Sequence, residues 1–417
     1  MIGAGGYAFE LIKLIWMIPE TIEIVGVSSN PNCDDAGKKS CLEKGIPVYD
    51  TVDALLENVH GKADVIYVAT PIYSHYDLTK QCLESGFAVW LEKPPVATIQ
   101  ELDGLIALSG KHGKKISVGF QYLYTTIVQA LKSRIVSGEF GKVSCVKGMA
   151  GWPRDDAYYS RSNWAGKIKI DGKWVLDGTI NNPLSHMLSC QLYLASPRAG
   201  TLAELATMEA ELYHGHNIES EDTSSLRIIT ENGVEVILLT SLCSKDEMNP
   251  AITVVCEKAT IALENFNVAT ITWHDGQTEK IIDDSEQRIH MLKKLAEGLG
   301  NGGDYAATVE TCRPFTIAVN SAFDSCGLPH KIESKFIDRF EHGNSVKTEI
   351  KGIDDVLITA YGSGKLFSEL GVPWAKPSEK ISVKDYNCFT GDFKSNDQLK
   401  TTIIRKQLRR DQIKDNV

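Results

Sequence analysis

The chain has 417 residues, of which 24% are charged, with a formal net charge of −10. This length predicts two domains, and without a basic stripe the acidic balance argues against a nucleic-acid-binding protein. No apolar run approaches the about 20 residues of a membrane-spanning helix, and the 10 cysteines form no Cys-x-x-Cys pair, which indicates reduced thiols and no metal site. We therefore expect a soluble, cytoplasmic protein whose basic cluster at 405–410 is a solvated terminal segment.

A glycine-rich turn opens the chain. The motif Gly3-x-Gly5-x-x-Ala8 precedes a helix-like run over residues 9–17. In dinucleotide-binding folds the first glycine permits the tight turn, the second lets the backbone approach the pyrophosphate, and the small third residue lets helix and strand pack closely. The predicted cofactor-binding residues here are Gly3, Gly5, Gly6, Tyr7 and Ala8. Since a strand usually has about five residues and only two precede the glycines, we expect that the given chain starts late.

The second predicted strand, residues 23–27, ends without the carboxylate that usually meets the adenosine ribose hydroxyls. Ser28, Ser29 and Asn30 follow it instead. Without a carboxylate a 2′-phosphate would not be repelled, and the serines or the nearby pair at 38–39 could hold it. Asn30 could equally serve a ribose hydroxyl. The sequence therefore leaves both NAD and NADP open.

Strands alternate with helices as far as residue 122. A capping box at Thr98 and Glu101 predicts one helix start, and Gly113 predicts its end. The other helices are expected after residue 51 and over 76–85, and the other strands over 63–71, 87–91 and 115–120. This alternation predicts a doubly wound parallel sheet, whose ligands bind at the carboxyl ends of the strands. Further cofactor candidates are therefore Thr70, Pro71, His75, Glu92, Lys93 and Gln121, although His75 could equally cap or pack at the next helix.

Lys93 stands where the strand at 87–91 meets two prolines. Proline cannot donate to a sheet ladder, so the backbone leaves the sheet with Lys93 at its carboxyl end. From this stretch alone, a catalytic lysine and a solvated lysine paired with Glu92 are equally compatible with the sequence.

Beyond residue 122 the alternation gives way to clustered strands. They are expected over 142–149, 204–213, 224–230, 234–241, 251–257, 260–264 and 269–274, and helices over 127–136, 285–299, 305–325 and 354–370. Strands with few helices between them predict a mostly antiparallel sheet. The predicted fold class is α/β, with an N-terminal Rossmann domain (1–122) and a C-terminal α+β domain with a large open sheet (123–417).

Aromatic and hydrogen-bonding side chains gather between residues 152 and 192. Flat rings suit the C–H faces of a polyhydroxylated ligand, and amides suit its hydroxyls. The substrate-binding candidates are Tyr122, Arg161, Trp164, Asn181, Asn182 and His186. Asn182 and His186 are four residues apart, so we expect them on one face of a helix. Although a lone histidine on a helix is more often structural, this pairing favours a role in the chemistry.

Together these motifs resemble the glucose-fructose oxidoreductase, inositol dehydrogenase and MocA family over nearly the whole chain. The resemblance rests on the glycine motif, on Ala69-Thr70-Pro71 with His75, on Glu92-Lys93-Pro94, which is the specific part, and on Gly119-Phe120-Gln121. It implies a homo-oligomer built through the open face of the second sheet. The family's catalytic lysine falls on Lys93, and its Asp-x-x-x-His pair falls on Asn182 and His186. The histidine matches, whereas Asn182 replaces the aspartate, and Asp177 just upstream could compensate.

We therefore predict hydride transfer between a nicotinamide cofactor and a carbon of a sugar, inositol or related polyol. His186 would act as general base, and Lys93 would stabilise the developing alkoxide. One alternative is an NAD-dependent glycosidase-type reaction without net redox change. The other is a catalytically silent nucleotide-sensing regulator, which the Asn182 substitution motivates and the retention of both Lys93 and His186 opposes.

Overall fold

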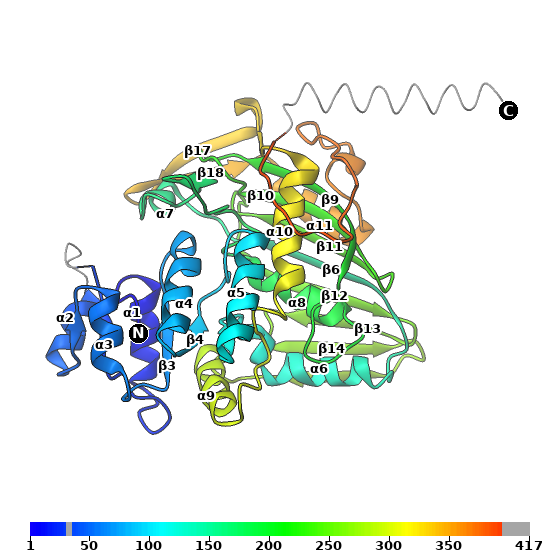
Figure 1. Ribbon diagram of the computed structural model, residues 1–417. Coiled ribbons are helices and arrows are strands. Elements are labelled where there is room, and N and C mark those ends of the chain that lie inside the picture. Colours follow the sequence, from blue (N-terminus) through cyan, green and yellow to red (C-terminus); the bar gives the residue numbers. More distant parts are fainter. Residues whose placement is uncertain (31–35, 394–417) are drawn as a thin grey trace.

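The computed structural model describes residues 1–30 and 36–393, so the basic cluster predicted at 405–410 lies outside the described residues. A parallel sheet in the first 120 residues and a larger sheet in the rest of the chain organise the fold (Figure 1). Helices α5 (Ile99–His112) and α10 (Arg313–Cys326) pack against each other between them. The predicted fold class is confirmed.

The parallel sheet consists of β1 (Val27–Ser28), β2 (Val48–Tyr49), β3 (Val65–Val68), β4 (Ala88–Leu91) and β5 (Ile116–Val118). The pairs β1 with β2, β3 with β4 and β4 with β5 are all parallel. Ile2 joins the two groups, because it forms parallel bridges to both Ser28 and Val68. The residues just before the glycine turn therefore lie at the centre of the sheet, which is the Rossmann arrangement.

The helices of this first part are α1 (Tyr7–Ile15), α2 (Ala36–Glu43), α3 (Val52–Val59), α4 (His75–Glu84) and α5. α5 begins as predicted, since Thr98 and Glu101 form the capping box, and it ends at Gly113, whose φ is 61°. α2 was not predicted, because it buries only Gly37 and Cys41 and so has no apolar periodicity. The strand predicted over 23–27 is observed only as β1, which begins at Val27. Residues 23–26 form no ladder with any described strand, and the Met1 amino group donates to the Gly26 carbonyl.

The large sheet has the strand order β15-β14-β13-β12-β6-β11-β10-β9-β16, with β19 also paired to β9. Its neighbours are antiparallel except for β6 with β11 and β9 with β16. The strands are β6 (Val143–Gly151), β9 (Leu205–His214), β10 (Thr223–Thr230), β11 (Glu235–Ser241), β12 (Met248–Cys256), β13 (Ala259–Glu264), β14 (Val268–Trp273), β15 (Thr278–Ile282), β16 (His330–Lys331) and β19 (Ile381–Ser382).

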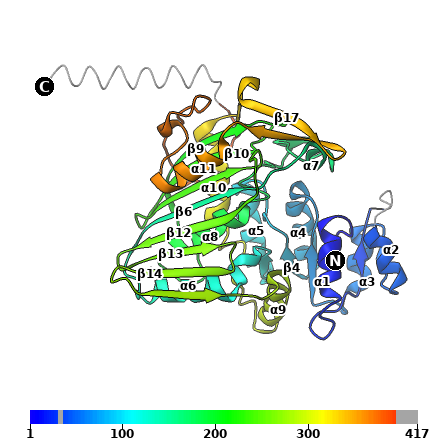
Figure 2. The same ribbon diagram turned by 180° about the vertical axis from the view of Figure 1, so that it is seen from behind.

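Both faces of this sheet are covered at β11. Val236 and Leu238 belong to the core shared with α6 (Thr126–Val136), α8 (Ser185–Ala195) and α10, whereas Ile237 and Leu239 pack with α11 (Ile353–Ser363) on the other face. Successive side chains of a strand point to opposite faces, so the apolar run of β11 serves two cores. Figure 2 shows the sheet from the side of α11.

Several ends and small elements differ from the predictions. The helix predicted over 305–325 begins only at Arg313, with Pro314 in its first turn. The helix predicted over 354–370 ends at Ser363, because Gly364 takes a left-handed φ of 68°. The hairpin of β17 (Ile337–His342) and β18 (Ser345–Ile350) gave no alternating apolar signal. The remaining elements are α7 (Asp156–Ser160), β7 (Lys169–Ile170), β8 (Lys173–Trp174) and α9 (Gln287–Gly300).

Direct hydrogen bonds join the two parts of the chain. On α10, the Asn320 side chain accepts from the Ile99 amide at 2.8 Å and donates to the Ala97 carbonyl at 2.8 Å. Nearby, the Arg313 guanidinium pairs with Asp103 of α5 at 2.8 Å. None of the cysteines among the described residues forms a disulfide. None of the described helices combines the length and the apolar character that crossing a membrane requires.

Candidate active site

A cavity of about 900 Å³ lies at the carboxyl ends of the parallel strands. Its volume falls in the range of cofactor and small-molecule sites. Both parts of the chain line it, and most of the predicted site residues meet there: Gly5, Gly6, Tyr7, Ala8, Thr70, Pro71, Glu92, Lys93, Gln121, Tyr122, Arg161, Trp164, Asn182 and His186.

The glycine turn forms one end of the cavity. A Cβ on Gly3, whose φ is 101°, would lie 2.5 Å from the Ala69 carbonyl oxygen, so no other residue fits there. Gly6 precedes the first residue of α1 with a φ of 52°, and the buried Ala8 lies in the first turn. The amino end of α1 therefore borders the cavity, an arrangement that suits the pyrophosphate of a dinucleotide.

Glu92 is turned into the protein. One carboxylate oxygen accepts from the Tyr67 hydroxyl at 2.6 Å and the other from the Lys93 amide at 3.1 Å. Gly119 leaves room for it, because a Cβ there would lie 2.9 Å from the first of these oxygens. Burial raises the pKa of Glu92. This carboxylate thus fixes the backbone at Lys93 and leaves the ammonium group for other partners.

The Lys93 ammonium reaches across to the second part of the chain. Its Nζ donates to the Asn182 carbonyl at 2.9 Å and to Asn182 Oδ1 at 3.1 Å. Asn182 Nδ2 in turn donates to Asp177 Oδ1 at 2.7 Å, and Asp177 Oδ2 accepts from the Gly166 amide at 2.7 Å. Burial lowers the pKa of Lys93, and the charges of Glu92 and Asp177 oppose that shift. The Asn182 amide therefore bridges the lysine and a buried carboxylate.

His186 lies in the first turn of α8, with its ring edge-on to those of Tyr122 at 5.0 Å and Phe120 at 5.9 Å between centroids. Burial, and then the charge of Lys93, lower its pKa well below the usual 6.5, so the ring is neutral at neutral pH. Its Nδ1 is buried without a hydrogen-bond partner. The expectation that Asn182 shares a helix face with His186 is wrong, because α8 begins at Ser185 and Asn182 lies in the preceding turn.

Five predicted residues lie outside the residues that line the cavity, and one of them is Gly3, described above. His75 is buried, with Nδ1 2.9 Å from the Pro94 carbonyl and Nε2 2.8 Å from the Thr70 carbonyl, so it ties two loops of the site together. Asn181 is also buried and donates to the Val175 carbonyl at 3.2 Å. Ser29 and Asn30 follow β1, and the Ser29 amide donates to the Tyr49 carbonyl.

Aromatic rings form one wall of the cavity, called here the aromatic wall. The Arg161 guanidinium lies 3.7 Å from the ring centroid of Tyr158 and 5.3 Å from that of Trp164. Tyr122 stacks on Phe266 at 3.8 Å between centroids. Sequence analysis did not name some further lining residues as site candidates: Trp152, Tyr158, Ser162, Pro183, Glu286, Gln287 and Arg288. The last three lie at the start of α9 and belong to no motif, and the helix prediction alone marked their position.

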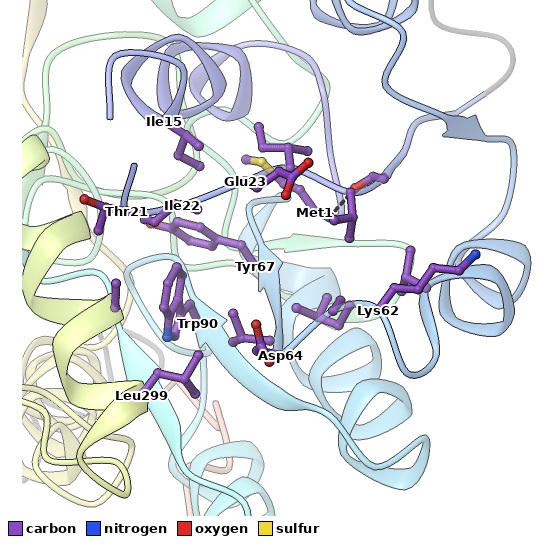
Figure 3. Close-up of a pocket in the computed structure, with 18 residues that line it drawn as sticks. Met1, Ile15, Thr21, Ile22, Glu23, Lys62, Asp64, Tyr67, Trp90 and Leu299 are labelled. Carbon is purple, nitrogen blue, oxygen red and sulfur yellow. Dashed lines mark hydrogen bonds between the residues drawn. The ribbon is translucent and has the colours of Figure 1, made fainter. Parts of the chain in front are cut away.

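A smaller cavity of about 310 Å³ lies at the amino ends of β1 and β3 (Figure 3). Ile22, Glu23, Tyr67, Trp90 and Leu299 are among its lining residues. Ligands of open α/β sheets bind at the carboxyl ends of the strands, and the predicted site residues line the larger cavity. We therefore assign the candidate active site to the larger cavity.

The glycine turn, the parallel sheet and the cavity shared with a second sheet define a two-part protein of the dinucleotide-binding class. The family model described as "Oxidoreductase family, NAD-binding Rossmann fold" matches residues 1–120, and the "GFO/IDH/MocA C-terminal domain" matches residues 128–262. The chain belongs to the Gfo/Idh/MocA family. The predicted family and its nicotinamide dinucleotide cofactor are confirmed.

Individual relatives are distant. The D-glucoside 3-dehydrogenase of Escherichia coli K12 is 29% identical over 147 residues, which are 34% of this chain and 40% of that enzyme, so the match spans less than half of the enzyme. The WlbA dehydrogenase from Bordetella pertussis, solved with NADH and UDP-GlcNAcA, has a TM-score of 0.63 at 18% identity, covering 77% of this chain and 94% of its own. An inositol dehydrogenase homolog from Azotobacter vinelandii, solved with NADH and myo-inositol, has a TM-score of 0.65 at 15% identity, covering 78% and 94%. These structures show the same fold.

Proposed function

We propose that this protein is an NAD(P)-dependent oxidoreductase that transfers a hydride between nicotinamide and the CH–OH carbon of a sugar, inositol or related polyol. The observation that carries the proposal is that Lys93 and His186, from different parts of the chain, line one cavity with the glycine turn. The proposal includes a Rossmann domain over 1–122, a substrate and oligomerisation domain over 123–417, a homo-oligomeric state and a cytoplasmic location.

The chain offers a place for each part of the cofactor. The glycine turn and the amino end of α1 would hold the pyrophosphate, while Thr70, Pro71 and Gln121 line the cavity towards Lys93. Ser29 and Asn30 would meet the adenosine ribose, where no carboxylate selects against a 2′-phosphate. When bound, the nicotinamide ring supplies the hydride chemistry, and the protein supplies position and charge.

His186 accepts the proton of the substrate, and Lys93 stabilises the negative charge that forms. In the oxidising direction the neutral His186 imidazole accepts the proton of the substrate hydroxyl. The Lys93 ammonium then faces the negative charge that develops on the same oxygen. General acid–base help of this kind is typically worth about 10²–10⁴-fold in rate. The lowered pKa of Lys93 also brings its proton closer to exchange with an alkoxide.

Asn182 positions Lys93, and Asp177 supplies the charge that Asn182 lacks. An amide cannot ionise, yet its oxygen accepts from Lys93 and its nitrogen donates to Asp177. The Asp177 carboxylate therefore takes the place of the one that an aspartate at position 182 would offer, and the Asn182 side chain lies between it and Lys93. This arrangement supports an active enzyme over a silent regulator, because the lysine still has a fixed partner and a compensating charge.

The first test measures cofactor binding and turnover in the purified protein. Added NAD and NADP are titrated, and a panel of sugars and inositols is then screened for cofactor reduction by absorbance. We expect Lys93→Ala to abolish turnover while dinucleotide affinity changes little, and the exposed α5 lysine variant Lys111→Ala to behave as wild type. Normal turnover by Lys93→Ala would remove Lys93 from the mechanism.

Two other outcomes would replace the proposal. Tightly held cofactor without net absorbance change, together with cleavage of chromogenic glycosides, would establish the non-redox glycosidase. Cofactor binding with neither activity would establish the nucleotide-sensing regulator.

A further inference from the structure

We infer that the preferred substrate of this cavity is anionic, a sugar or polyol bearing a carboxylate or phosphate group that binds against Arg161. The inference rests on the proposed function, because it concerns the substrate of the same cavity. Three observations carry it: the lack of a described carboxylate at hydrogen-bond distance from Arg161, the fixed orientation of its guanidinium group, and the engagement of the nearby Asp177 carboxylate by other donors.

Arg161 lines the cavity, and the described part of the chain places no carboxylate at hydrogen-bond distance from it. Lys93 and Arg161 both line the cavity, and the carboxylate they share is Asp177, whose Oδ2 lies 3.9 Å from Arg161 Nη2. Among the described lining residues the two other carboxylates have their own partners. Glu92 faces Tyr67 at 2.6 Å, and Glu286 faces Arg288 at 2.9 Å. Glu92 and Asp177 both act on Lys93, so Arg161 shares the nearby Asp177 carboxylate with the lysine.

Asp177 does not fully satisfy Arg161. Its Oδ1 already accepts from Asn182 and its Oδ2 from the Gly166 amide, both at 2.7 Å. The 3.9 Å separation from Arg161 exceeds hydrogen-bond distance. The carboxylate therefore lowers the potential around the guanidinium without occupying its N–H groups.

The Arg161 side chain is held in place and still reachable. Its plane lies over the Tyr158 ring, and one terminal nitrogen donates to the Tyr158 carbonyl. About a third of the side chain is exposed (32%). A guanidinium has five N–H donors in a rigid fork that matches carboxylate and phosphate oxygens. The fork thus retains donors for an anion entering the cavity.

Arg154 adds to the same field. Its guanidinium lies 5.2 Å from the Tyr158 ring centroid and 5.8 Å from that of Trp152, so this wall carries two arginines. A neutral polyol in the cavity would displace water from Arg161 without bringing a negative charge to it. The guanidinium would then lose solvation without compensation, which costs free energy of binding. An anionic substituent offsets that cost, and charge-assisted bidentate bonds are the stronger kind.

The test compares matched anionic and neutral compounds on the full-length protein with saturating NAD. Turnover and equilibrium binding are measured for D-gluconate, D-glucuronate and D-glucose 6-phosphate against D-glucose and myo-inositol. We expect the best anionic compound to exceed the best neutral one about 10-fold or more in kcat/KM and in affinity, since a hydrogen bond to a charged group contributes about 1.5–3 kcal/mol. Whether the protein prefers the carboxylates or the phosphate shows which anionic group its substrate bears.

Variants locate the effect. Arg161→Gln should raise KM for the anion about 10- to 100-fold with little change in kcat, and it should leave KM for neutral compounds nearly unchanged. Arg161→Lys keeps the charge but loses the forked guanidinium, so its KM for the anion should lie between those of the wild type and of Arg161→Gln. The matched control is Lys167→Gln, which should behave as wild type. Lys167 lies six residues after Arg161, and its exposed side chain pairs with Glu219. Thermal unfolding of each variant verifies that it is folded.

The outcomes separate the two proposals. Neutral compounds that bind and turn over as well as the anionic ones would overturn the anionic substrate and leave the oxidoreductase intact. Anion binding that survives Arg161→Gln would equally overturn it. If no compound reduces NAD, the oxidoreductase proposal fails, and the binding series still decides whether the cavity selects anions.

Discussion

Asp177→Asn tests whether a buried carboxylate tunes Lys93 through the Asn182 amide. Asp177 accepts two short hydrogen bonds, from the Asn182 side chain and from the Gly166 amide. An asparagine has one acceptor oxygen, so its NH₂ group must face one of these donors. The variant therefore loses one hydrogen bond and the negative charge, while the volume of the side chain is conserved.

The magnitude follows from that loss. A hydrogen bond to a charged group contributes about 1.5–3 kcal/mol, so we expect kcat/KM to fall about 10- to 100-fold. Asp177 raises the pKa of Lys93, which burial lowers. Removing the carboxylate lets the pKa of Lys93 fall further, so the ammonium form is lost at a lower pH. The basic limb of the pH–kcat/KM profile should therefore move to lower pH.

The assay is steady-state kinetics across pH, with dinucleotide affinity and thermal unfolding measured beside it. Asp171→Asn, at an exposed position in the turn between β7 and β8, is the matched control and should leave the profile unchanged. A purely structural role for Asp177 would lower stability without moving the basic limb. An unmoved limb with wild-type kcat/KM would refute the proposed coupling between Asp177 and Lys93.

Three other substitutions have expected outcomes. Asn182→Asp places a second carboxylate beside Asp177 and Lys93. It should raise the pKa of Lys93 and so move the basic limb of the pH–kcat/KM profile to higher pH. Repulsion between the two carboxylates should lower the melting temperature above neutral pH. Gly3→Ala should abolish dinucleotide binding in titrations and destabilise the fold by about 1–3 kcal/mol, because φ is positive and the added Cβ meets a carbonyl. Glu221 is buried and its pKa is raised to about 7, so its own contribution to stability, about 3 kcal/mol, is fully present below pH 4.5 and is lost as pH rises through 7. Glu221→Gln should flatten that dependence in thermal melts; an equally steep fall would exclude this carboxyl as its source.

Local signals were sufficient for most of the first sheet. The capping box at Thr98 and the glycine at 113 act within a few residues, so they were visible in the sequence. The second strand was predicted too long over 23–27, because its length depends on the neighbouring chain at Ile2. In the hairpin of β17 and β18, β17 is exposed after Ile337 and β18 buries only Thr348 and Ile350, so burial left little alternating pattern in its residues.

The site was less accessible to sequence reasoning. Lys93 could be placed at a strand end, but its contact with Asn182 spans 89 residues of chain and depends on the packing of two sheets. The lining residue Arg288 has no motif at all, since its position depends on where α9 docks. His75 carried two readings in the sequence, and only the tertiary structure shows its ring nitrogens facing carbonyls of two loops.

The bonds of Asn320 to residues 97 and 99 and the pairing of Arg313 with Asp103 cross from α10 to α5 beside the cavity. Swinging one part of the chain away from the other would break them together, and the four groups at the Asn320 junction are buried backbone or amide atoms that would lack partners. These bonds therefore oppose a hinge at this boundary. Under the proposed function, we expect substrate to enter by local movement of side chains, of which the partly exposed Arg161 is one, before any movement of whole domains.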